Sequence, residues 1–254
     1  MHGKADSVEL TDDIWDKFHA LKDTLSGYEA RDVFNVDETG LFYKLQPNKT
    51  LRDSAVKGQK KDKTQITVGL CANMDGSIKA PPLIIHKSKN PRTFASRRIK
   101  RPNNLGITWY SNKKAWMTGE VFQDWMLRFE GYVKALGRTK VALIVDNAPG
   151  HLIAPIADKL IVTKLFFLPP NTTSRFQPMD AGIIQSFKMQ FCRLVIRKQL
   201  ADFENQKPFT MDVYHVVLLV VQAWSESVTV STIQNCWKHC DLVPHNYDRP
   251  GRVR

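Results

Sequence analysis

Cysteine is scarce in this sequence, with four among 254 residues. So few cysteines in a chain of this length exclude the disulfide-rich scaffold of small secreted domains. Cys236, His239 and Cys240 lie close together, with His245 nearby, but no second closely spaced pair completes the usual ligand set of a zinc site. We therefore expect no zinc and interpret the cysteines as reduced, partly buried thiols.

Long hydrophobic runs are missing as well. The first ten residues, MHGKADSVEL, contain no apolar core of the kind that marks a secretory signal. The longest apolar stretch, residues 213–224, is interrupted by Tyr214, His215 and Gln222 and falls short of the ~20 residues that a membrane-spanning helix needs. With 43% hydrophobic and 24% charged residues, the composition is that of a globular protein that can bury a large core. We expect no membrane partner.

Negative charge is absent from one long part of the chain. Residues 76–119 contain no Asp or Glu but ten Lys and Arg, whereas residues 1–40 contain ten acidic and four basic residues. The net charge of +12 favours a polyanionic partner through attraction to phosphates, although a basic protein can also be charged only for solubility. We predict a DNA-binding surface made of Lys57, Lys60, Lys61, Lys63, Lys87, Lys89, Arg92, Arg97, Arg98, Lys100, Arg101, Lys113 and Lys114.

Hydrophobic periodicity predicts an alternation of strands and helices. Short apolar runs between turn-forming residues predict strands at 33–36, 41–45, 65–73, 82–86, 141–145 and 164–168. Helical spacing and capping residues predict an acidic helix followed by a turn within 11–31, and helices from Thr118 and after Gln177-Pro178. Residues 211–239 also have a helical pattern, although their run of valines is compatible with a strand, and the basic stretch 87–114 is expected to be a loop. This order predicts an α/β, ribonuclease-H-like fold: a mixed central sheet flanked by helices, with a C-terminal helical extension. We place an acidic helical lead-in at 1–30, the core at 31–205, and a C-terminal helical segment and tail at 206–254.

Three aspartates occupy positions where chemistry is expected. Asp37 follows the apolar run 33–36 and Asp146 follows 141–145, and the ends of central strands are where open α/β sheets build sites. Asp180 begins a helix and shares its inward face with apolar residues, so it either caps that helix or is paired with a metal. Carboxylate oxygens on several elements suit Mg²⁺ or Mn²⁺. Two such ions ~4 Å apart can activate an attacking oxygen and stabilise a leaving one.

Four short motifs, in one order along the chain, carry a family resemblance. They are NVDETGLF at 35–42, VDNAPGH at 145–151, LPPNTTS at 168–174 and QPMD at 177–180. Together they resemble the DDE superfamily endonuclease domain of pogo/Tigger-like transposases, whose relatives include centromere-binding and jerky-type domesticated proteins. The resemblance implies that Asp37, Asp146 and Asp180 are the first, second and third metal-binding, catalytic aspartates. It also implies that Asn147 and His151 border the metal site and orient its ligands.

The same resemblance implies a function. It is metal-dependent DNA phosphodiester hydrolysis and strand transfer in the nucleus, with two Mg²⁺ (or Mn²⁺) ions as cofactors. The expected partners are transposon ends, target DNA and further copies of the chain in a homo-oligomer on the DNA. The helix-turn-helix region of the family lies upstream of the first aspartate, where 36 residues leave no room for it, so we expect weak recognition of transposon ends. The alternative is a domesticated, transposase-derived DNA- or chromatin-binding protein that keeps the fold without cutting.

Overall fold

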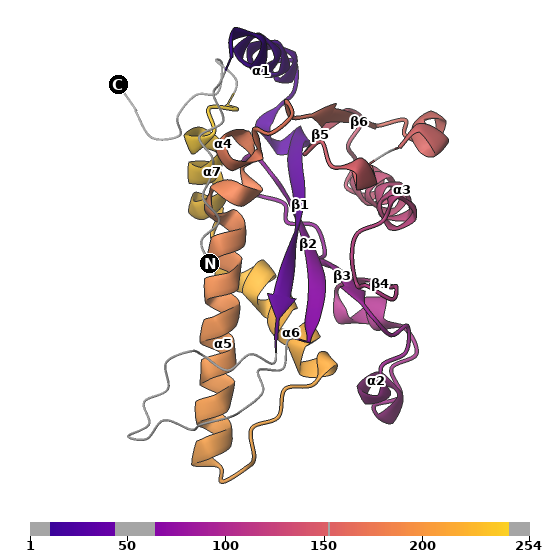
Figure 1. The fold of residues 1–254 in the computed structure, drawn as a ribbon, viewed down its shortest axis with the longest axis vertical. Coiled ribbons are helices and arrows are strands. Elements are labelled where there is room, and N and C mark those ends of the chain that lie inside the picture. The colour runs from indigo at the N-terminus through magenta and orange to yellow at the C-terminus, as the bar shows by residue number, and fades with distance from the viewer. Residues whose placement is uncertain (1–10, 44–63, 152, 244–254) are drawn as a thin grey trace.

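The computed structural model describes residues 11–43, 64–151 and 153–243 (Figure 1). Its strands are β1 (Val33–Phe42), β2 (Gln65–Asn73), β3 (Leu83–His86), β4 (Thr108–Ser111), β5 (Val141–Val145) and β6 (Thr163–Phe167). Its α-helices are α1 (Asp12–Leu25), α2 (Arg92–Ser96), α3 (Gly119–Ala135), α4 (Thr173–Phe176), α5 (Ile184–Glu204), α6 (Val213–Gln222) and α7 (Val230–His239). The strands form one six-stranded sheet in the order β4-β3-β2-β1-β5-β6, in which β2 runs antiparallel to the rest. The predicted mixed sheet flanked by helices is confirmed.

β1 is one continuous strand, whereas the sequence predicted two short strands at 33–36 and 41–45. Its neighbour β2 pairs with it without interruption from Phe34↔Asn73 to Phe42↔Gln65, which keeps the chain extended through the polar residues between. β5 pairs only with Val33–Asn35, the first three residues of β1, so β1 continues past the end of β5 with β2 beside it and β3 beyond β2. Asp37 therefore lies in the middle of β1 rather than at its end.

One face of the sheet is covered by α3 (Figure 1). Phe122, Trp125 and Phe129 of this helix are buried in a cluster with Phe34 of β1 and side chains of β5. The helix begins where the sequence predicted, because the hydroxyl of its N-cap residue Thr118 accepts a hydrogen bond from the N–H of Val121.

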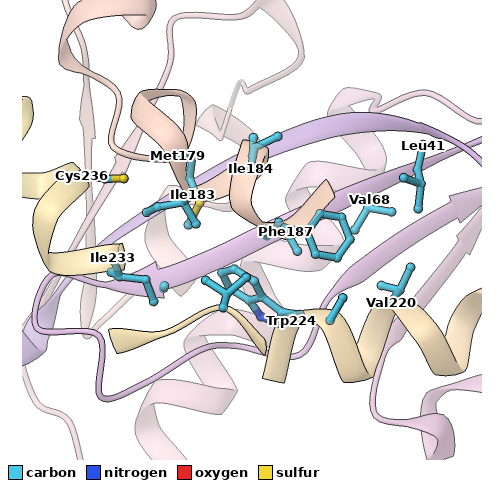
Figure 2. Close-up of a cluster of buried hydrophobic side chains, with 14 of the residues drawn as sticks. Leu41, Val68, Met179, Ile183, Ile184, Phe187, Val220, Trp224, Ile233 and Cys236 are labelled. Atoms are coloured by element: carbon cyan, nitrogen blue, oxygen red, sulfur yellow. The ribbon is translucent and has the colours of Figure 1, made fainter. Parts of the chain in front are cut away.

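The other face is covered by α5, α6 and α7, whose side chains interdigitate over β1 and β2 (Figure 2). Phe187 of α5, Trp224 and Ile233 are fully buried there, beside Val68 of β2. The apolar face predicted for α5 is thus confirmed. The two clusters sandwich the sheet and hold its strands, and the site they carry, in a fixed frame.

The basic stretch 87–114 is not the continuous loop that the sequence predicted. It contains α2 and the edge strand β4, which runs parallel to β3 from Leu83↔Thr108 to His86↔Ser111. The four residues of β4 are all partly exposed, so they lack the apolar alternation by which a strand is recognised. The first helix agrees with its prediction, since α1 ends at Leu25 and a turn follows it.

The C-terminal helical region is broken rather than continuous over 211–239. A π-helical turn, η6 (Ala223–Ser227), separates α6 from α7, and the two parts are bent by 75°. Lys79 donates hydrogen bonds to the carbonyls of Ser225 and Val228 at this turn, and Trp224 Nε1 donates to the carbonyl of Ala80 at 2.9 Å. Among the described residues no single helix is long and apolar enough to span a membrane, although this bent pair reaches the length and hydropathy together.

Glu130 is a buried carboxylate that fastens α3 to the start of β6. Its Oε1 accepts the N–H groups of Ile161 and Val162 at 3.0 and 2.9 Å, and its Oε2 accepts the N–H of Thr163 at 3.0 Å. Lys134 Nζ lies 2.9 Å from Oε1. Burial favours the neutral acid, but these hydrogen bonds to the charged form dominate and lower the pKa of Glu130 to about 2.

Candidate active site

The three predicted aspartates meet at the edge of the sheet where its parallel strands end. Asp146 directly follows β5, and Asp37 lies at the same level of β1 because Asn35 is paired with Ile144. Asp180 comes from a π-helical turn, η5 (Met179–Ile183), that joins α4 to α5. Burial is the main cause that raises the pKa of Asp37 and of Asp180, and the charge of Asp180 adds to it at Asp37 as that of Asp146 does at Asp180. Asp180 therefore lies within electrostatic range of both other aspartates.

Asp37 is the most buried of the three, with 9% of its surface exposed. Burial raises the pKa of its carboxyl group well above the ordinary value, and the charges of Asp180 and Glu38 raise it further. The Glu38 N–H, which donates to Asp37 Oδ1 at 2.8 Å, and the buried Gln177 amide act in the opposite direction without reversing the effect. Asp37 is therefore harder to ionise than an ordinary aspartate, and a bound cation would favour its charged form.

Asp180 does not lie on the inward face of a regular helix, as the sequence predicted. The π-helical turn directs its side chain to the exposed rim of the site, where loss of part of its hydration still raises its pKa. The turn depends on Gly182, whose φ of 150° and ψ of −12° are readily adopted only by glycine. Asn35 fixes its position, since Asn35 Oδ1 accepts the Met179 N–H at 2.9 Å and Asn35 Nδ2 donates to the Ile144 carbonyl at 3.0 Å. One buried amide thus ties the turn to both strands that carry the other aspartates.

His151 connects Asp146 to Glu38. Its Nδ1 lies 2.6 Å from Asp146 Oδ1 and its Nε2 lies 3.4 Å from Glu38 Oε2. The ring is buried, and its centre lies 4.4 Å from that of Phe122 in α3. Burial would lower the pKa of His151, but the two carboxylates raise it to about 10, so the ring is an imidazolium at neutral pH.

The imidazolium in turn sets the state of Asp146. Burial favours the protonated acid, but His151 and the Ala148 N–H hold the pKa of Asp146 below its ordinary value. Asp146 is therefore ionised at neutral pH, while Asp37 resists ionisation. The contacts of His151 suit the orienting role predicted for it, whereas the exposed Asn147 side chain has no hydrogen-bond partner among the residues that the structure describes.

The donor set suits hard divalent cations, since all three aspartates offer carboxylate oxygens. Within the described parts of the chain, however, no three Asp, Glu, His or Cys side chains converge closely enough to hold an ion as they stand. In this arrangement the imidazolium of His151 neutralises Asp146. An ion shared by the aspartates would offset the burial, and the charge of the neighbouring carboxylates, that raise the pKa of Asp37 and Asp180.

Comparison with known proteins identifies the family. Residues 63–237 match the family model described as DDE superfamily endonuclease. The chain belongs to this family.

Relatives of this DDE-family chain include CENP-B homolog protein 2 of Schizosaccharomyces pombe, which is 33% identical over 238 residues that cover 91% of this chain and 46% of that protein. Tigger transposable element-derived protein 4 of Mus musculus is 36% identical over 214 residues, which cover 82% of this chain and 39% of the relative. The chain thus spans less than half the length of these two curated relatives. Its fold resembles that of the Mos1 strand transfer complex, with a TM-score of 0.51 at 11% identity over 91% of this chain and 59% of that one. The predicted family resemblance and the ribonuclease-H-like fold are confirmed.

The predicted DNA-binding residues of the DDE-family chain fall into two groups. Lys57, Lys60, Lys61 and Lys63 lie outside the described residues. The other nine are exposed: Lys87, Lys89, Arg92, Arg97, Arg98, Lys100, Arg101, Lys113 and Lys114. They follow β3 or β4, which run in the same direction as β1 and β5, and β3 ends level with Leu41, four residues past Asp37 along β1. Arg97 is also engaged within the fold, because its guanidinium lies 3.1 Å from Asp212 and 4.6 Å from the centre of the Tyr214 ring.

Glu38 is a candidate site residue that the sequence analysis missed. Successive residues of a strand point to opposite faces, so Glu38 lies on the α3 face while Asp37 lies on the other, and adjacency in sequence gives no hint of a shared site. The alternation of side chains along the strand, combined with the predicted role of His151, is the signal from which Glu38 could have been found.

We predict that Glu38→Gln weakens Mn²⁺ binding by roughly 10- to 100-fold, the usual effect of removing a partner that orients a ligand from behind. The amide keeps the size of the side chain but cannot hold the His151 imidazolium by charge. The measurement is isothermal titration calorimetry with Mn²⁺, with the exposed Glu226→Gln as the matched control. Equal affinities for Glu38→Gln and wild type would show that Glu38 does not act on Asp146.

Proposed function

We propose that this chain performs metal-dependent DNA cleavage and strand transfer, as the catalytic domain of a pogo/Tigger-like transposase. The observation that carries the proposal is the grouping of Asp37, Asp146 and Asp180 around the end of β5, in a chain whose nine described basic residues after β3 and β4 are exposed. Mutually repelling carboxylates are costly for a protein to keep together without a cation, and the adjacent positive charge suits a phosphodiester backbone.

Asp37, Asp146 and Asp180 would hold two Mg²⁺ or Mn²⁺ ions, which supply activation of the attacking oxygen and stabilisation of the leaving oxygen. The chain itself supplies the geometry. Asn35 fixes the π-helical turn of Asp180 against the strands, and His151 holds Asp146 in one orientation. The basic residues after β3 and β4 bind phosphates and set the register of the DNA, without reading its sequence.

The proposed substrates are transposon ends and target DNA, and the proposed place of action is the nucleus, with copies of the chain assembled on the DNA. Similarity to a Tigger transposable element-derived protein supports the substrate class. Similarity to a CENP-B homolog keeps open the alternative, a domesticated DNA-binding protein that no longer cuts.

Calorimetric titration of Mn²⁺ into wild type and Asp146→Asn tests the metal site. We expect saturable binding by wild type and a loss of at least about 100-fold in the variant, since a neutral amide replaces an ionised ligand. Asn keeps an oxygen that can accept from His151, so the fold should be unchanged in circular dichroism. Cleavage of a nicked or supercoiled plasmid by wild type in Mn²⁺, but not in EDTA, then separates the endonuclease from the domesticated alternative. Folded wild-type protein that binds DNA but binds no metal, whether DNA is absent or present, would overturn the proposal.

A further inference from the structure

Trp116 is presented to solvent in a way that the fold itself does not need. Its side chain is 60% exposed, although it lies in a short segment between β4 and α3 whose backbone is tightly held. The Trp116 N–H donates to Asn112 Oδ1 at 3.2 Å, and Asn112 Nδ2 donates to the Trp116 carbonyl at 2.7 Å. One amide side chain thus fixes both backbone polar groups of a residue whose indole packs against little.

The preceding residue shows how this presentation is achieved. Ala115 is buried and has a φ of 54°, a left-handed conformation that is unfavourable for residues other than glycine. Its carbonyl accepts a hydrogen bond from Thr67 Oγ1 of β2 at 2.6 Å, which anchors the segment to the sheet. Strained backbone that is held by its surroundings and ends in an exposed aromatic side chain points to a contact made with another molecule.

The position of the segment places that contact beside the three aspartates. Thr67, its anchor, is paired with Gly40 in the part of β1 that extends past β5. At the other end of the segment, Gly119 at the start of α3 lies against Gly150, the neighbour of His151, with 3.9 Å between its Cβ position and the Gly150 carbonyl oxygen. Trp116 therefore lies in a segment that is anchored to β2 at one end and, at the other, contacts the loop that carries His151.

The charges around Trp116 select the partner. Lys113 and Lys114 are exposed in the turn directly before it, and Lys114 Nζ lies 5.6 Å from the centre of its ring. Residues 76–119 contain no acidic side chain. An indole face flanked by ammonium groups suits a nucleobase with its phosphates, because the ring stacks on the base while the lysines neutralise the backbone. Bases within an intact duplex have no free face, so the matching ligand is an unpaired base.

We infer that Trp116 is a stacking platform for an unpaired DNA base next to the cleavage site. This inference deepens the proposed function and rests on it, since it assumes that DNA lies across the sheet edge. The platform would hold a base that is freed when the strands separate at the cut, and Lys113 and Lys114 would fix the adjoining phosphates.

The test compares binding of a blunt duplex and of the same duplex with a single-stranded overhang, in Ca²⁺ so that no strand is cut. A 2-aminopurine in the overhang reports stacking by quenching of its fluorescence, and anisotropy gives the affinity. We expect Trp116→Ala to weaken binding of the overhang DNA by about tenfold and to remove the quenching, while binding of the blunt duplex is unchanged. Trp116→Phe should keep most of the affinity for the overhang DNA and most of the quenching. Phe203→Ala, which removes an 81% exposed aromatic side chain of α5, should match wild type.

The outcomes separate the inference from the proposed function. Equal binding and equal quenching by wild type and Trp116→Ala would overturn the inference while leaving the proposed function standing. A wild-type protein that binds neither DNA would overturn both. A change of oligomeric state in sedimentation of Trp116→Ala, with DNA binding unaltered, would also overturn the inference and assign Trp116 to a protein interface.

Discussion

Asp37→Asn is expected to abolish Mn²⁺-dependent DNA cleavage and, in the absence of metal, to raise the melting temperature. Both effects have one cause. The buried carboxyl group of Asp37 resists ionisation because of burial and the charges of Asp180 and Glu38, and the fold pays for that charge at neutral pH until a cation neutralises it. Asparagine removes the charge and with it the ligand.

The direction of the pH dependence follows from the raised pKa. A group whose pKa is higher in the folded than in the unfolded protein costs stability as pH rises through the ordinary aspartate range, up to the folded value. The difference in melting temperature between Asp37→Asn and wild type should therefore be largest at neutral pH and vanish in acid, where both states are protonated. For a chain of this size each kcal/mol corresponds to about 2–4 °C.

Differential scanning calorimetry with and without Mn²⁺, at several pH values, measures this. The exposed Asp16→Asn of α1 is the matched control and should behave as wild type in every condition. If Mn²⁺ stabilised Asp37→Asn as strongly as wild type, Asp37 would not be a metal ligand.

Glu130→Gln is expected to destabilise the protein by about 3 kcal/mol at neutral pH, because a pKa of about 2 in place of 4.5 reflects roughly that much preference for the ionised form in the fold. Glutamine can still accept from Ile161 and Val162, but its amide nitrogen cannot accept from Thr163. The buried N–H left without a partner adds to the loss.

Here the pKa is lowered on folding, so the stabilisation by Glu130 is fully present above pH 4.5 and is lost as pH falls from there toward 2. Urea unfolding of wild type and Glu130→Gln should therefore differ most at pH 7 and progressively less below pH 4.5. The exposed Glu120→Gln in the first turn of the same helix serves as the control. A difference between Glu130→Gln and wild type that did not change with pH would mean that lost packing, rather than the ionised carboxylate, is responsible.

Much of the fold could be predicted because its strongest signals are local. The apolar run 141–145 is long enough to specify a buried central strand, and the aromatic residues of α3 recur at helical spacing behind a capping threonine. β1 was predicted as two strands because Asp37, Glu38 and Thr39 interrupt its apolar pattern. Pairing with β2, a non-local interaction, keeps these residues in one continuous strand. β4 could not be predicted because an edge strand that is partly exposed on both faces shows no alternation of apolar and polar residues.

The sequence likewise predicted part of the candidate site and missed the rest. Asp37, Asp146 and Asp180 could be selected from motifs, but their different states could not, because these depend on what lies around each carboxylate in space. Asn35 stood within a recognised motif, yet its role appears only when its amide is seen bonded to Met179, 144 positions away. The roles of the aspartates themselves stay predictions until metal binding is measured, as does the boundary placed at residue 206.

The packing of α6, η6 and α7 on the sheet has a consequence for how copies of such a gene decay. Trp224 and Trp237 are almost completely buried, and residues from 213 to 242 supply side chains to the cluster beneath α5. A nonsense codon or frameshift within residues 213–242 would leave the codons of Asp37, Asp146 and Asp180 intact, yet the translated chain could not close its core. Such a copy would be silent through misfolding, so intact codons for these three aspartates would not identify the copies that encode a folded protein.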